Sequence, residues 1–152
     1  MLFFSRSKLA LFPFYRELAG INMDGSLPPG LLLLSELEVL NLSRNALVGT
    51  LPPQWASVSL ILLDLSYNKL NGPLPVAYGS KETFPKLASI FLQGNAFSGP
   101  FPGPEWTTIG FAPQVVITLR PGNDALCGPV TIIDPRFYQA IPNDQGAPQL
   151  LI

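Results

Sequence analysis

The sequence predicts an α/β solenoid, in which the chain winds into stacked coils whose short strands form a parallel sheet, with few or no regular helices. The first observation behind this prediction is a pattern of eight Leu, Asn, Gly and Pro positions that occurs three times at a nearly constant period. The second is the composition, because 17 Pro and 13 Gly among 47% hydrophobic and 12% charged residues suit a turn-dense fold and not a disordered chain. The third is the length of 152 residues, which makes one domain with a modest core.

The repeated pattern reads Leu-x-x-Leu-x-Leu-x-x-Asn-x-Leu-x-Gly-x-Leu-Pro when Ile and Phe are allowed to replace Leu. Its three complete copies contain Asn45, Asn68 and Asn95, which lie 23 and 27 residues apart. A period of this size is typical of solenoids, because each unit buries its apolar side only against its neighbours.

Two degenerate copies flank the complete ones. The upstream copy keeps five of the eight positions and has Ile21 in the place of Asn. The downstream copy has Asn123, but Leu119 and Leu126 each fall one place out of register. We therefore expect a solenoid of about five coils over residues 18–130, since terminal units of a solenoid are atypical.

Each position of the repeat has a physical reason. Leu-x-x-Leu-x-Leu combines a spacing of three with a spacing of two, which predicts a bend that leads into a short strand. Along that strand, alternate side chains face the core and the solvent. The Asn side chain has one acceptor and two donors for backbone groups at a sharp turn, so Asn45, Asn68 and Asn95 are predicted to be structural. Gly and Leu-Pro mark a second corner.

These motifs closely resemble the plant-type leucine-rich repeat over about residues 18–130. Residues 51–55, Leu-Pro-Pro-Gln-Trp, also resemble repeats of green-algal leucine-rich-repeat proteins. Residues 122–129, Gly-Asn-Asp-Ala-Leu-Cys-Gly-Pro, resemble the last coil before the C-terminal cap of plant receptor ectodomains. The resemblance implies a curved right-handed coil with the parallel sheet on its concave face, and short strands or turns at the Leu-Pro segments on another face.

The two ends of the array are predicted separately. Residues 1–17 are rich in aromatic residues and are expected to form an N-terminal cap over the first coil. The stretch 109–119 is expected to cover the last coil, and residues 131–152 read as an extended C-terminal tail. An uncapped coil exposes leucines and an unpaired strand edge, so we expect self-association through ends that lack a cap.

Several function classes are excluded by composition and motifs. The sequence contains no His, no Gly-x-Gly-x-x-Gly and no Gly-x-x-x-x-Gly-Lys, so we expect no catalytic activity, no metal and no cofactor. The lone Cys127 is expected to be a small buried hydrophobic residue. A net charge of −1 without a basic block argues against nucleic acid, and no apolar run is long enough for a transmembrane segment.

The cysteine count and the start of the chain bear on the compartment. A single Cys cannot form an internal disulfide, and Arg6 and Lys8 interrupt the apolar start of the chain, so an intracellular site is expected. The resemblance to green-algal proteins allows this site to be a cilium or the cytoskeleton. An extracellular or membrane-associated site is expected instead if the chain is part of a receptor. The sequon at Asn41, Leu42 and Ser43 is interpreted as chance in an Asn-rich repeat.

The outward strand positions are the candidate partner-binding site. Stacking in parallel would form three columns: Asn41, Asp64 and Phe91; Ser43, Ser66 and Gln93; and Arg44, Tyr67 and Gly94. Arg and aromatic residues are enriched at interface hot spots, although ordinary solvated positions are the alternative interpretation. The residues expected to bind a protein or peptide are Asn41, Arg44, Asp64, Tyr67, Phe91 and Gln93.

A column of aromatic residues allows two interpretations. Trp55 and Tyr78 fall ten residues after the repeat Asn, and Trp106 falls eleven after. These residues could form a ligand-binding ladder or a seam that joins adjacent coils, and the seam is favoured because Leu31 occupies the same place in the first coil.

The sequence therefore predicts a non-enzymatic protein-interaction module that binds a protein or peptide on the concave face. The alternatives are a fragment of a receptor-like ectodomain that senses an extracellular ligand, a structural scaffold in a cilium or the cytoskeleton, and an enzyme inhibitor.

Overall fold

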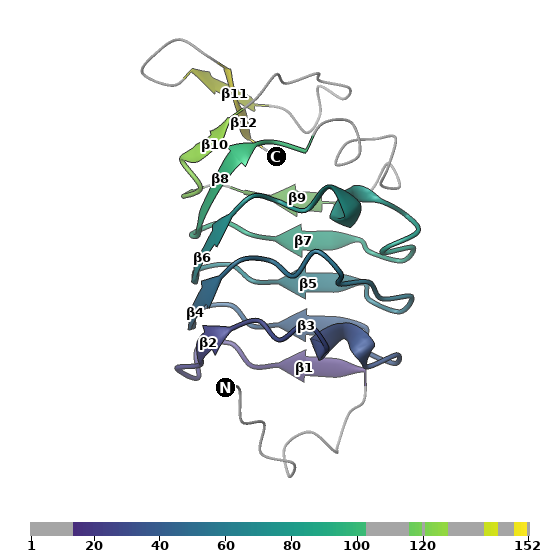
Figure 1. Ribbon diagram of the computed structural model, residues 1–152. Coiled ribbons are helices and arrows are strands. Elements are labelled where there is room, and N and C mark those ends of the chain that lie inside the picture. The colour runs from purple at the N-terminus through teal and green to yellow at the C-terminus, as the bar shows by residue number, and fades with distance from the viewer. Residues whose placement is uncertain (1–13, 103–115, 120, 128–138, 143–147, 152) are drawn as a thin grey trace.

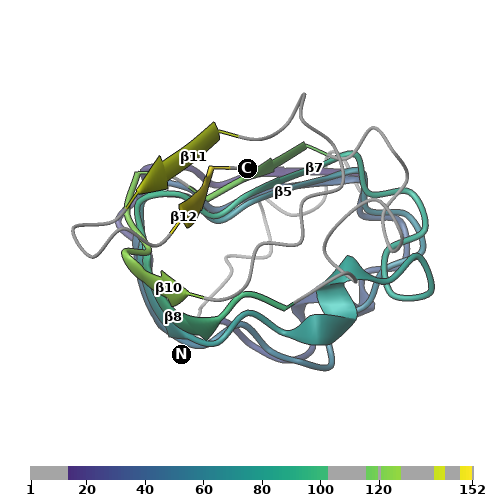
Figure 2. The ribbon, with the colours of Figure 1, turned by 90° about the horizontal axis from the view of Figure 1, so that it is seen from above.

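The computed structural model describes residues 14–102, 116–119, 121–127, 139–142 and 148–151. It is a β-solenoid in which five coils each contribute one strand to each of two parallel sheets (Figure 1). Seen along the stack, the coils overlie one another and the two sheets line different sides of the coil (Figure 2). Regular helix in the described residues is limited to two short 3-10 turns, which confirms the predicted solenoid of short parallel strands with few or no regular helices.

The first sheet has the order β1-β3-β5-β7-β9 and the second has the order β2-β4-β6-β8-β10. The strands of the first sheet are β1 (Tyr15–Glu17), β3 (Val39–Asn41), β5 (Leu62–Asp64), β7 (Ser89–Phe91) and β9 (Val116–Thr118). The strands of the second sheet are β2 (Asp24–Ser26), β4 (Ala46–Gly49), β6 (Lys69–Gly72), β8 (Ala96–Pro100) and β10 (Ala125–Cys127). The 3-10 turns are η1 (Leu31–Leu33) and η2 (Val76–Gly79).

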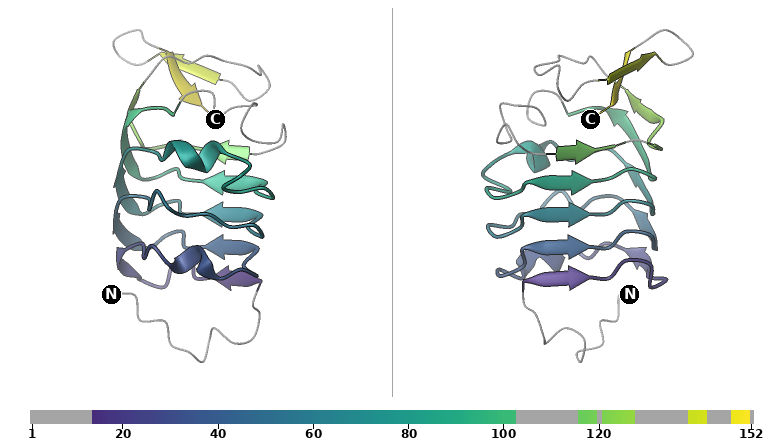
Figure 3. Two further views of the ribbon diagram at one scale, coloured as in Figure 1. Left: turned by 45° about the vertical axis from the view of Figure 1, so that its right-hand side comes forward. Right: turned by 180° about the vertical axis from the view of Figure 1, so that it is seen from behind.

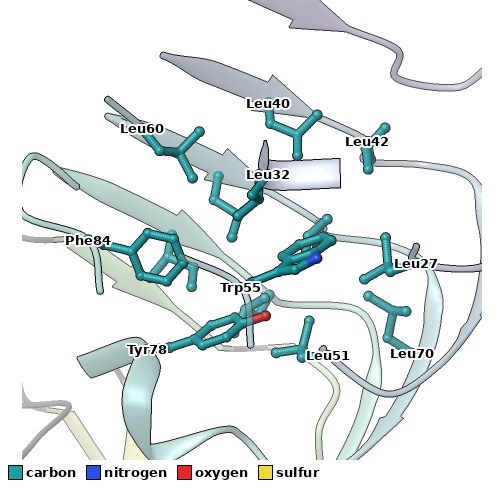
Figure 4. Packing of buried hydrophobic residues seen from close by; sticks show 14 of the residues in the cluster. Leu27, Leu32, Leu40, Leu42, Leu51, Trp55, Leu60, Leu70, Tyr78 and Phe84 are labelled. Carbon is teal, nitrogen blue, oxygen red and sulfur yellow. The ribbon is translucent and has the colours of Figure 1, made fainter. Parts of the chain in front are cut away.

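The core lies between the two sheets and is built from the repeat leucines. The register aligns Leu40 with Leu63, Ile90 and Ile117, one inward residue from each of β3, β5, β7 and β9. Leu40, Leu63 and Ile90 are fully buried, as are the Leu residues two places further along each of the three complete repeats. The prediction that these apolar positions form the core is confirmed, and Figure 4 shows leucines from several coils packed together.

The second sheet starts earlier in the repeat than expected. In the complete repeats, its strands begin directly after the repeat Asn and contain the x-Leu-x-Gly segment, as in β4, whereas Leu51 and Pro52 follow the strand and belong to no regular element. Gly49 and Gly72 have φ values of +84° and +78°, so the chain turns at a backbone conformation that favours glycine. The corner that was predicted at the Gly and Leu-Pro positions therefore begins at the Gly.

The ends of the array differ from the predicted boundaries. Tyr15–Glu17, which the sequence analysis assigned to an N-terminal cap, pair with β3 as the first strand of the sheet. Val116–Thr118, within the stretch expected to cover the last coil, are the fifth strand. In the predicted C-terminal tail, β11 (Gln139–Pro142) and β12 (Pro148–Leu151) pair antiparallel, so part of the tail is a two-stranded sheet. Residues 1–13, the rest of the predicted cap, lie outside the described residues.

Across the described ranges, no helix is long and apolar enough to span a membrane.

Replacing Leu63 with Ala should lower the free energy of unfolding by ~2–5 kcal/mol, because the change leaves a cavity in a packed core. Chemical denaturation of the purified chain measures this change. The matched control is Leu33→Ala, since Leu33 is 83% exposed on η1. A control loss as large as that of Leu63→Ala would contradict the assignment of the core.

Candidate functional site

The repeat asparagines join each coil to the preceding one. Asn68 donates from Nδ2 to the carbonyl of Leu42 in the preceding coil and to that of Leu65 in its own coil, both at 3.0 Å. Its Oδ1 accepts the backbone N–H of Leu47 at 3.1 Å. Asn45 and Asn95 make the equivalent bonds to both coils. The asparagines thus have the backbone hydrogen bonds that the sequence analysis expected, and we call this row the asparagine ladder.

The ladder continues into the last coil. Asn123 is 1% exposed, donates to the carbonyls of Leu92 and Leu119 at 3.0 and 2.8 Å, and accepts the N–H of Phe97 at 2.9 Å. Its partner in its own coil lies four residues back, whereas it lies three residues back in the complete repeats. The turn between strand and Asn therefore absorbs the extra residue that puts Leu119 out of register in the sequence.

The aromatic column is a buried seam between coils. Trp55 donates from Nε1 to the carbonyl of Pro28 at 3.1 Å, and the Tyr78 hydroxyl donates to the carbonyl of Pro52 at 2.8 Å, in each case one coil back. The two side chains are 1% and 0% exposed and lie among leucines (Figure 4). Burial raises the pKa of the Tyr78 hydroxyl above its ordinary value. These two residues are therefore a seam and not a ligand-binding ladder, while Trp106 lies outside the described residues.

The outward side of the first sheet, which we call the strand face, consists of register-aligned rows. One row contains Glu17, Asn41, Asp64, Phe91 and Thr118, of which Asn41, Asp64 and Phe91 form the first predicted column. Viewed from behind, the five strands face the reader and no described segment crosses in front of them (Figure 3). The sheet therefore offers five strands as an open surface in the described part of the chain.

A second outward row was missed by the sequence analysis. Tyr15 aligns with Val39, Leu62 and Ser89, and Tyr15 is 57% exposed whereas the other three are half-buried. The signal was available, because alternation about an inward Leu sends both of its neighbours outward. The strand face thus combines an apolar row with a polar one.

Two of the predicted binding residues also hold the turn that follows their strand. The Oδ1 of Asn41 accepts the N–H of Ser43 at 3.0 Å, and its Nδ2 donates to Oε1 of Glu17 at 2.6 Å. The Oδ1 of Asp64 accepts the N–H and the hydroxyl of Ser66 at 2.9 and 2.6 Å. These bonds fix the orientation of both side chains on the strand face.

The second predicted column is largely absent from the surface. Ser43 and Ser66 are 6% and 3% exposed, because the turns held by Asn41 and Asp64 fold them inward. Gln93 is half-buried, and its Oε1 is a buried atom without a hydrogen-bond partner. The placement of Ser43 and Ser66 as outward residues was wrong.

The third predicted column forms a stacked edge beside the strand face. Arg44 and Tyr67 have φ values of 56° and 54°, and Gly94 has 71°, so all three occupy the left-handed region. The Arg44 guanidinium lies 5.0 Å from the centroid of the Tyr67 ring, a cation–π distance. A Cβ added to Gly94 would come within 2.5 Å of that ring, so the absence of a side chain there leaves room for Tyr67.

No group of three or more potential metal ligands occurs among the described residues. The backbone of Cys127 ends β10, and its side chain, which was expected to be buried, lies outside what the structure describes.

Sequence comparison places this geometry among repeat proteins of plants. Residues 36–58 and 59–80 match the family model described as Leucine Rich Repeat. A receptor protein kinase-like protein of Arabidopsis thaliana is 34% identical over 91 residues, which are 60% of this chain and 11% of that protein. Receptor-like protein 35 of the same plant is 39% identical over 79 residues, which are 51% of this chain and 8% of that protein. The chain therefore spans a small part of these relatives.

Solved structures agree with the sequence comparison. A chain of the BIR3–SERK2 complex from Arabidopsis thaliana has 31% sequence identity and a TM-score of 0.56, and the match covers 74% of this chain and 55% of that chain. A chain of the complex of the Arabidopsis receptor kinase HAESA with the peptide hormone IDA and the co-receptor SERK1 has 28% identity and a TM-score of 0.56, covering 78% and 18%.

The asparagine ladder, the two parallel sheets and the buried seam define a solenoid that presents one open strand face. Two of these coils, residues 36–58 and 59–80, match the leucine-rich-repeat family model, and the relatives that the chain resembles in sequence are plant receptor-like proteins.

Replacing Tyr78 with Phe should lower the free energy of unfolding at neutral pH by ~0.5–1.5 kcal/mol through loss of the bond to Pro52. The Pro52 carbonyl keeps the N–H of Trp55 as a donor, so the loss is that of one bond and not of an orphaned acceptor. Because the pKa of Tyr78 is raised in the folded chain, ionisation of its hydroxyl favours the unfolded chain. The contribution of this hydroxyl to the free energy of unfolding is therefore fully present below the unfolded-state pKa of about 10, and it decreases as the pH rises above that value.

The stability gap between wild type and Tyr78→Phe should therefore narrow as the pH rises above about 10. Denaturation at a series of alkaline pH values measures this gap. A gap that stays constant or widens would contradict the burial of this hydroxyl in the seam.

Proposed function

We propose that this chain is a non-enzymatic protein-interaction module that binds a peptide or protein on the strand face. The observation that carries the proposal is the open sheet of five register-aligned strands with mixed apolar and polar outward rows. The asparagine ladder and the aromatic seam hold these strands from behind, so ordering the surface on binding costs little conformational entropy.

The named complexes support this kind of partner. The HAESA complex contains a peptide hormone and a co-receptor, and the BIR3 complex contains a second protein, SERK2. At about 4.8 Å between neighbouring strands, the five strands of the first sheet span ~19 Å. That width suits an extended peptide or a small protein patch, so both classes of partner fit.

We infer no catalytic role for the chain, although several relatives are named as kinases. The sequence offers neither a His nor a glycine-rich phosphate-binding motif. The receptor-like relatives favour an extracellular or membrane-associated site over the intracellular one expected from the sequence. A ciliary or cytoskeletal scaffold and the green-algal resemblance remain predictions from the sequence.

A second candidate function is inhibition of a hydrolase. Polygalacturonase inhibitor 1 of Arabidopsis thaliana is 40% identical over 48 residues, which are 32% of this chain and 14% of that protein. An assay of polygalacturonase activity with increasing amounts of the chain tests this candidate. A dose-dependent loss of activity supports inhibition, and unchanged activity at saturating chain opposes it.

Replacing Tyr67 or Phe91 with Ala should weaken binding of a partner isolated by pull-down by ~1–2 kcal/mol if either side chain is a hot spot. Titration calorimetry measures the affinity, and circular dichroism confirms that each variant remains folded. Val76→Ala is the matched control, because Val76 is 55% exposed on η2, away from the strand face. Loss of affinity with Val76→Ala, together with unchanged affinity for both strand-face variants, would move the site to another surface.

A further inference from the structure

The strand face carries negative charge that the described residues do not neutralise. Glu17 and Asp64 lie in the same outward row, separated by Asn41. Neither carboxylate forms an ion pair within the described part of the chain. The nearby arginines have other contacts, because Arg16 donates from Nη1 to the carbonyl of Tyr15 and the Arg44 guanidinium lies over the Tyr67 ring.

Both carboxylates are held in place by neutral donors. Glu17 accepts from the Asn41 side chain at 2.6 Å, and Asp64 accepts from the N–H and hydroxyl of Ser66 at 2.9 and 2.6 Å. These bonds orient the groups and leave their charge intact. The two charges are therefore fixed points on a rigid sheet.

The spacing of the two carboxylates selects a peptide conformation. They are two strands apart, which corresponds to ~9.6 Å across the sheet. In a polyproline II helix, residues three apart lie on the same side and are separated by ~9.3 Å. In a β-strand, residues on the same side are two apart and separated by only ~6.7 Å. The spacing thus matches polyproline II and not an added strand.

An apolar row lies beside the charged row. Tyr15, Val39 and Leu62 are the outward residues two places earlier on the same three strands, and all three are at least partly exposed. The faces of proline rings can pack on such a row while basic side chains reach the carboxylates. The charged row and the apolar row therefore both suit a proline-rich segment that carries basic residues.

We propose that the strand face over β1, β3 and β5 binds a peptide segment in polyproline II conformation, which runs along the stack and carries basic residues three positions apart. This proposal rests on the proposed function and names the chemistry of its partner. The segment lies across the strands, so that its first basic residue meets Glu17 and its second meets Asp64.

The test uses the synthetic peptide Lys-Pro-Pro-Lys-Pro-Pro and the full chain labelled with ¹⁵N, titrated by NMR at low salt. The control peptide Lys-Pro-Lys-Pro-Pro-Pro has the same composition and charge, but its lysines are two positions apart. The first peptide should bind more tightly than the second, with shifts concentrated in β1, β3 and β5. Its affinity should fall as salt is added, because exposed charges are screened.

The protein variants remove charge while keeping the local hydrogen bonds. Glu17→Gln retains an acceptor for Asn41, and Asp64→Asn retains an acceptor for Ser66; Asn already occupies the aligned position 41. Each variant should weaken the first peptide by roughly two- to fivefold. Asp24→Asn is the control with the same change in net charge, since Asp24 is exposed on β2 in the second sheet, and it should leave the affinity unchanged.

Three results would overturn this proposal. The two peptides could bind with equal affinity, Asp24→Asn could weaken the first peptide as much as Glu17→Gln or Asp64→Asn does, or neither peptide could bind. Partner binding that still depends on Tyr67 and Phe91 in that case would leave the proposed function in place. The two failures are therefore distinguishable.

Discussion

The hydrogen bonds of the asparagine ladder are the constraint on which the rest of the fold depends. Each ladder asparagine joins the carbonyl ends of two successive strands and accepts an N–H from the preceding coil. A buried turn has unpaired backbone groups that would otherwise be costly to remove from water. One side chain per coil satisfies them and, by bonding to two coils at once, sets the register between those coils.

The leucine core and the aromatic seam act on the positions that the ladder has set. Like the ladder, the seam joins neighbouring coils through side-chain hydrogen bonds to the backbone, at another corner of the coil. The Pro28 and Pro52 carbonyls each accept an N–H in their own coil and an aromatic donor from the next coil. The coils are thus tied at two corners, with apolar packing between them. This register also aligns the outward residues of the strand face into rows. The buried ladder and seam residues therefore determine the surface that a partner meets.

The complete repeats could be read from the sequence, since Leu63 is buried in the core and Asn68 bonds to backbone groups that recur in every coil. The first strand was missed because, in the first coil, Arg16 occupies a Leu position of the repeat and Ile21 occupies the Asn position. Backbone pairing of this strand to β3 needs neither side chain. The burial of Ser43 and Ser66 depends on turns with left-handed residues at Arg44 and Tyr67, which strand alternation does not reveal. A signal existed in the glycines at the aligned positions 20, 94 and 122, all with positive φ.

The central claim, that the asparagine ladder holds the register between coils, is tested most directly by amide hydrogen exchange of the native chain and of Asn68→Ala. The amides of Leu47, Leu70 and Phe97 each donate to a ladder Oδ1, at 3.1, 3.0 and 2.9 Å. In the native chain all three should exchange slowly, and Asn68→Ala should lower the protection of Leu47 far more than that of Phe97. Exchange at Leu47 as fast as at the exposed loop residue Gln54 in the native chain, or unchanged protection of Leu47 in the variant, would contradict the account.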